Sequence, residues 1–157
     1  DNDLLNDMIL IVDRAAFGHD EVVRIFRARR GGEAVAVIME VIAPNGYNGN
    51  IVMLVGIEST GEITAARVLS HRETPGLGDP IEKRRSDWID SFQGRSLGDP
   101  PPARWAVRKD GGDFDQFTGA TITPRAVVTA VARALAYFED HQEILFQKES
   151  MKGPELE

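Results

Sequence analysis

The feature that most constrains the fold is a set of three stretches rich in valine and isoleucine. They span residues 34–42, 51–57 and 63–69. Each has the length of an ordinary strand, and β-branched side chains favour extended backbone. Ser-Thr-Gly-Glu at 59–62 suits a hairpin turn, and the Gly- and Asn-rich residues 44–49 suit a loop. We therefore predict an antiparallel meander, in which consecutive strands are neighbours in one sheet.

Four other stretches show weaker patterns. Residues 4–12 have the apolar spacing of an amphipathic helix, and residues 20–29 follow with Asp20 as a candidate cap, which predicts N-terminal helices within residues 1–30. Residues 81–92 are expected to form a helix with an aromatic inner side. Residues 104–108 are expected to form a short strand.

The last long pattern is helical and is the clearest one. Thr123 suits an N-cap, and Pro124 then takes the favoured first helical position. Val127, Val131 and Leu135 recur at helical spacing. With the meander, this helix predicts an α+β fold, a twisted antiparallel sheet with packed helices. At 157 residues, and with no linker, we expect a single domain over 1–157.

Composition excludes several classes of function. The net charge of −7 argues against a nucleic-acid partner, because phosphate backbones are bound by clustered Lys and Arg. The chain has no cysteine, which excludes thiol catalysis and Fe–S or zinc–thiolate sites. His19, His71 and His141 lie too far apart for a metal-ligand motif, so no metal is expected. No apolar run reaches the roughly 18 residues that a membrane helix requires.

Residues 115–124, Asp-Gln-Phe-Thr-Gly-Ala-Thr-Ile-Thr-Pro, carry the strongest functional signal. A turn of small residues leads directly into a helix N-terminus, where amide groups and the helix dipole favour an anion. Three threonine hydroxyls there can hydrogen-bond a phosphate or be esterified to one. An ordinary capped helix after a turn would show the same features, so these residues alone leave both interpretations open.

The segment Asp-x-x-Thr-Gly-Ala-Thr resembles the flavinylation motif of FMN-binding domains in Rnf complexes and sodium-pumping NADH:quinone reductases. Two further segments, residues 46–51 and 71–79, resemble family segments in the same order, and the likeness covers roughly 33–138. It is nearest to the G subunit of the Rnf electron-transport complex. The resemblance implies FMN, joined by a flavin transferase through a phosphoester to the last threonine of the motif, Thr121. Thr123 is the competing acceptor.

The resemblance also implies how the site is built. The turn residues would shape the phosphate site. From its charge alone, Lys109 is a candidate partner for the phosphate, with an ordinary solvated lysine as the alternative. The expected cofactor-binding residues of the motif segment are Thr118, Gly119, Ala120, Thr121, Ile122 and Thr123. A second wall against the flavin ring would come from Thr74, Pro75, Gly76, Leu77 and Gly78. Tyr47, in a glycine-flanked loop, is a candidate to stack on the ring, with a half-buried loop aromatic as the alternative.

By resemblance, the chain is expected to be a redox subunit of an ion-translocating oxidoreductase, without substrate turnover of its own. Its expected partners are the other subunits of a Rnf-type complex. The family's G subunit has a membrane anchor, so we expect this chain to be the domain that follows it, on the periplasmic side of the inner membrane. Two alternatives remain at this point: a small-anion binding module without redox chemistry, and a scaffold subunit.

Overall fold

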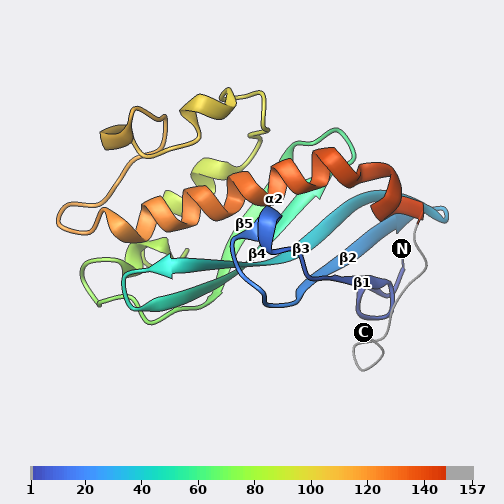
Figure 1. Ribbon diagram of the computed structural model, residues 1–157, viewed down its shortest axis with the longest axis horizontal. Coiled ribbons are helices and arrows are strands. Elements are labelled where there is room, and N and C mark those ends of the chain that lie inside the picture. The colour runs from blue at the N-terminus through green and yellow to red at the C-terminus, as the bar shows by residue number, and fades with distance from the viewer. Residues whose placement is uncertain (1, 148–157) are drawn as a thin grey trace.

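The computed structural model describes residues 2–147, and Figure 1 shows a sheet crossed by one long helix. The sheet has five strands in the order β1-β2-β3-β4-β5, and every neighbouring pair is antiparallel. The strands are β1 (Met8–Ile11), β2 (Val23–Arg30), β3 (Glu33–Gly46), β4 (Gly49–Glu58) and β5 (Ile63–Ser70). The predicted meander and the α+β class are confirmed.

The long helix α2 (Ile122–Gln147) covers one face of the sheet (Figure 1). Burial alternates along β3 and β4, as expected where one face packs on a helix and the other does not. Val37 and Met39 of β3 and Val55 of β4 are fully buried, as are Val127 and Val131 of α2. The apolar spacing of α2 therefore matches the apolar face of the sheet.

The N-terminal helices predicted within residues 1–30 are wrong. Of residues 2–30, only η1 (Leu4–Asn6) and α1 (Arg14–Phe17) are helical, and β1 and β2 occupy most of the rest. In β2, Val23, Ile25 and Arg27 all point to the buried face, a period of two rather than 3.6. The Arg27 guanidinium is 1% exposed, pairs with Asp7 at 2.8 Å and donates to the carbonyl of Leu145.

Between β5 and α2, the helical structure in residues 71–121 consists of short 3-10 turns. These are η2 (Asp79–Ile81), η3 (Trp88–Phe92), η4 (Pro102–Arg104) and η5 (Arg108–Asp110). The helix predicted over 81–92 is wrong: the segment turns twice so that Trp88 and Phe92 reach an aromatic cluster with Trp105 and Phe114. The strand predicted over 104–108 is also wrong, since only Val107 forms a bridge, with Phe114.

Candidate functional site

A cavity of about 220 Å³ opens at the N-terminal end of α2. Three segments far apart in the sequence enclose it: the β3–β4 hairpin, the loop at 74–78 and the turn before α2. It is lined by Tyr47, Thr74, Leu77, Gly78, Gly119, Ala120, Thr121, Ile122 and Thr123. The structure thus brings together residues that were assigned to one site from three separate sequence motifs.

The remaining predicted site residues do not line this cavity. Pro75 and Gly76 belong to the same loop, and the Gly76 amide donates to Asp79 Oδ1 at 2.9 Å. Thr118 is exposed in the turn next to Gly119. Lys109 lies on η5, where its amide donates to the side chain of Gln116, and it does not line the cavity.

The turn before α2 is closed by a hydrogen bond from the Ala120 amide to the Phe117 carbonyl at 3.2 Å. Gly119 has φ of 75°, a left-handed conformation that glycine adopts without strain. Phe117 packs edge-on against Trp88, and the Trp88 indole donates to the Asp115 carbonyl at 2.9 Å. The small-residue turn is therefore fixed to the aromatic cluster behind it.

The N-cap predicted for α2, Thr123, is wrong by two positions, since Thr121 is the residue that precedes the helix. The helix begins at Ile122, and the carbonyl of Thr121 accepts from the Arg125 amide at 3.2 Å. Thr121 therefore directly precedes the helix, whereas Thr123 and Pro124 lie within its first turn. The amides of Ile122 and Thr123 have no carbonyl one turn earlier in the helix to bond to, which makes this end attractive to an anion.

Glu73 connects the walls of the cavity, a role that no sequence pattern indicated. Its carboxylate is 4% exposed and accepts from the amides of Tyr47 at 2.9 Å and Asn48 at 3.0 Å. The Thr123 hydroxyl donates to the same carboxylate at 2.5 Å. One buried side chain thus holds the hairpin against the first turn of α2. Charged residues are usually exposed, so burial of this one could not be expected from its type.

Gly78 allows the loop to approach the helix closely. A Cβ atom at this position would lie 2.6 Å from Thr123 Oγ1 and 2.9 Å from the Cβ of Glu73. These distances are shorter than any ordinary contact, so a larger residue would push the loop away from α2. The glycine therefore fixes the width of the cavity at its base.

Acidic residues pair with the cations beside the site. Arg125 forms two hydrogen bonds to Asp110, at 2.6 and 3.0 Å, and Arg108 bonds to Asp115 at 2.6 Å. The hydrogen bond from Arg125 holds the pKa of Asp110 below its ordinary value. With these cations paired, the backbone amides at the start of α2 are the main groups that would attract a phosphate to the cavity.

The cavity has the surface character that FMN would require. Tyr47, Leu77 and Ile122 border it and are 66%, 43% and 43% exposed, which offers apolar surface to a flat aromatic ring. The helix start and threonine hydroxyls offer a phosphate site on the same cavity. Within residues 2–147 no cluster of side chains suits a metal ion, and no helix there is long and apolar enough to cross a membrane.

Comparison with known proteins identifies the family. The FMN-binding domain family matches residues 46–136, more than half of the chain. The G subunit of the ion-translocating oxidoreductase complex of Shewanella loihica is 52% identical over 148 residues, covering 94% of this chain and 70% of the relative. The protein of the same name from Pseudomonas aeruginosa is 48% identical over 155 residues, covering 99% of this chain and 72% of that protein.

A solved structure shares the fold. The crystal structure of Shewanella oneidensis NqrC matches with a TM-score of 0.63, over 87% of this chain and 68% of that chain. The two sequences are 23% identical over the match, so this likeness supports the fold alone.

Proposed function

The chain belongs to the family of Rnf-type ion-translocating oxidoreductase G subunits with an FMN-binding domain, and from this premise we propose that it carries FMN covalently on Thr121. Membership makes it an electron-transport subunit of a membrane complex. The proposed linkage is a phosphoester in which the phosphoryl group of FMN replaces the hydroxyl hydrogen of Thr121. The observation that carries the proposal is the position of Thr121, on the cavity and directly before α2.

The three threonines of the motif differ in their surroundings. Thr121 is half-buried and lines the cavity. Thr123 is 2% exposed, and its hydroxyl is bonded to Glu73, so esterification there would break the contact that joins hairpin and helix. Thr118 is exposed in the turn and does not line the cavity. These differences favour Thr121 as the acceptor.

When bound, FMN would supply the electron-carrying chemistry. The residues of the chain would hold and orient it. The Ile122 and Thr123 amides would face the phosphate, Leu77 and Tyr47 would cover the ring, and the loop at 74–78 would keep it against the helix. Among the described residues of the cavity wall there is no carboxylate or histidine to move a proton to a substrate. This supports a relay without substrate turnover of its own.

The proposed partners follow from the family. They are the other subunits of the Rnf-type complex, which would give and accept the electrons, and a flavin transferase for maturation. The proposed location of the domain is the periplasmic side of the inner membrane. A covalent tether suits such a carrier, because a flavin exposed at an interface between subunits cannot then dissociate.

The test is the intact mass of the chain after co-expression with a flavin transferase. We expect a gain of one FMN less one water in the wild type and in Thr118→Ala, and no gain in Thr121→Ala. A control flavoprotein domain establishes that the transferase is active. No gain in the wild type would leave the small-anion module or the scaffold as the function, and a gain that survives Thr121→Ala would move the linkage to another residue.

A further inference from the structure

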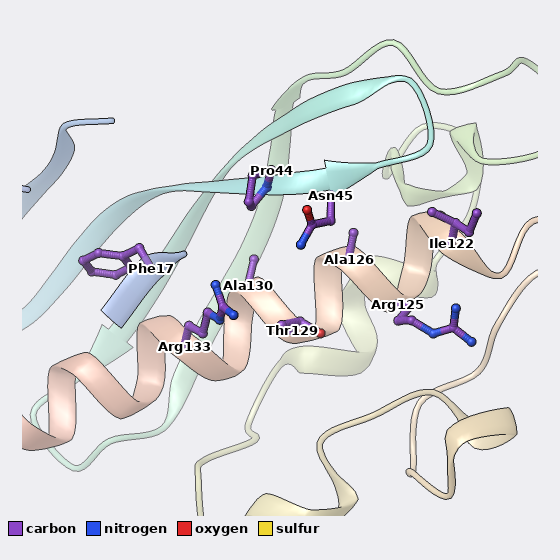
Figure 2. Close-up of a pocket in the computed structure, with 9 residues that line it drawn as sticks. All are labelled: Phe17, Pro44, Asn45, Ile122, Arg125, Ala126, Thr129, Ala130 and Arg133. Atoms are coloured by element: carbon purple, nitrogen blue, oxygen red, sulfur yellow. The ribbon is translucent and has the colours of Figure 1, made fainter. Parts of the chain in front are cut away.

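A second cavity, of about 280 Å³, lies along α2 (Figure 2). Its wall includes one stripe of the helix, at positions 122, 125, 126, 129, 130 and 133, together with Phe17 of α1 and the end of β3. The two cavities share Ile122 in their walls. Nothing in the flavin site requires this second cavity.

Arg133 lies at the end of the stripe nearest α1. Its guanidinium packs on the backbone of Gly18, where a Cβ would lie 1.7 Å from its Nη1. Unlike the Arg125 side chain, which pairs with Asp110, the Arg133 side chain has neither an acidic partner nor a hydrogen bond among residues 2–147. Figure 2 shows the Arg125 side chain directed away from Arg133. A half-buried cation therefore faces this cavity without a counter-charge.

Two further hydrogen-bonding side chains line the cavity without a partner in the described part of the chain. They are the Thr129 hydroxyl, one turn before Arg133, and the Asn45 amide at the end of β3. The guanidinium has five N–H donors in a planar fork that matches a carboxylate. In a chain of net charge −7, this wall combines an unpaired positive charge with two further donors.

Apart from Arg125, which is paired with Asp110, the remainder of the wall is apolar. Phe17, Pro44, Ala126 and Ala130 contribute mainly carbon surface, which suits a short hydrocarbon chain. The volume suits a compound of a few carbon atoms. Arg133 and Thr129 are one turn apart on the helix, and Figure 2 shows Asn45 farther along it, above Ala126. Because carbon surface lies between and beside these polar groups, the wall matches a short molecule with an acidic group and an aliphatic body.

From this arrangement we infer that the cavity binds a short aliphatic carboxylate, with Arg133 as the anchor of the carboxyl group. Thr129 donates the neighbouring hydrogen bond, and Asn45 donates to the molecule farther along the helix. The inference does not depend on flavin attachment, since none of these three side chains lines the flavin cavity. It can be tested on the chain without FMN, so its failure would leave the proposed flavin linkage standing.

The experiment is an NMR titration of the ¹⁵N-labelled chain with succinate, at ionic strength held constant with chloride. We expect saturable shifts of the Gly18, Asn45 and Thr129 amides, and no such shifts with neutral succinamide. Arg133→Gln should weaken binding about tenfold or more, because a hydrogen-bonded charge pair contributes about 1.5–3 kcal/mol. Arg30→Gln, an exposed arginine on β2, is the matched control and should bind as the wild type does.

Thr129→Val removes one donor without touching the packing on Gly18, and should weaken succinate binding about threefold to tenfold. It keeps the test valid if Arg133→Gln does not fold. Shifts that do not saturate, or equal affinity in the wild type and Arg133→Gln, would overturn the inference. Inorganic phosphate that binds through Arg133 more tightly than succinate does would overturn the assignment to a carboxylate.

Discussion

The sheet with α2 and the segment at 71–121 are held together in different ways. In the sheet, four antiparallel pairings satisfy the backbone, and alternate side chains of β3 and β4 share one apolar face. In the segment, individual side chains make the connections: the Trp88 indole to the Asp115 carbonyl, the Trp105 indole to the Ser96 carbonyl and the Glu73 carboxylate to the hairpin. The flavin cavity lies where these two regions meet, so its geometry depends on a few individual contacts.

The largest effect is expected where the segment has its own core. Phe92 is fully buried and contacts Trp88, Trp105 and Phe114 at centroid distances of 5.0–6.1 Å. Phe92→Ala should lower the free energy of unfolding by about 3–5 kcal/mol, since it removes a buried ring and leaves a cavity. Urea denaturation measures this, with exposed Leu69→Ala as the control. A loss below about 1 kcal/mol would mean that this cluster does not hold the segment.

The second largest loss of stability is expected at Glu73, because its side chain joins the two regions directly. Glu73→Ala leaves the buried Thr123 hydroxyl and two amides without their acceptor, and should cost about 2–3 kcal/mol in the free energy of unfolding, measured by urea denaturation. Glu73→Gln keeps an acceptor oxygen and should cost less. We also expect the Ala variant to incorporate less flavin, because Tyr47 is no longer held at the cavity. Equal stability of the two variants would contradict this role of the carboxylate.

A substitution at Gly78 tests how closely the loop at 74–78 packs against α2. Gly78→Ala should destabilise the fold by about 1–3 kcal/mol through overpacking against Thr123 and Glu73. Gly98 has open space around its Cβ position and a negative φ, so Gly98→Ala is the matched control. Thermal unfolding compares the two variants. If Gly78→Ala is as stable as Gly98→Ala, the loop is not pressed against α2.

The smallest effect is expected at the exposed pair of Asp110 and Arg125. The hydrogen bond from Arg125 lowers the pKa of Asp110 in the folded state. The pair's contribution to stability is therefore complete above about pH 4, the ordinary range of a free carboxyl group, and is lost as pH falls through the lowered pKa. In an NMR titration, Arg125→Gln should raise the pKa of Asp110. An unchanged pKa would contradict this pairing in solution.

The sequence predicted the parts of the fold that follow a backbone period. Residues 34–42, 51–57 and 63–69 lie within β3, β4 and β5, and the final apolar stripe lies within α2. The prediction for β2 was wrong because Arg27, a charged residue, occupies a buried position of the strand. The alternation of apolar and polar residues that marks a strand is therefore not visible in the sequence. It failed again over 81–92, where aromatic packing rather than helical periodicity decides the backbone.

The candidate site was predictable to a similar degree. Its three motifs could be recognised from the sequence, and the structure brings Tyr47, Leu77 and Thr121 to one cavity. The capping role assigned to Thr123 was wrong, because its hydroxyl bonds to a residue 50 positions earlier in the chain. Such long-range contacts of single side chains leave no periodic signal. Glu73 and Arg133 could not be predicted for the same reason.

The most direct test of the central claim is peptide mapping of the flavinylated chain by tandem mass spectrometry. We predict that FMN is found on Thr121 alone, with Thr118 and Thr123 unmodified. FMN on Thr123 would contradict the claim, because that hydroxyl would first have to give up its hydrogen bond to Glu73.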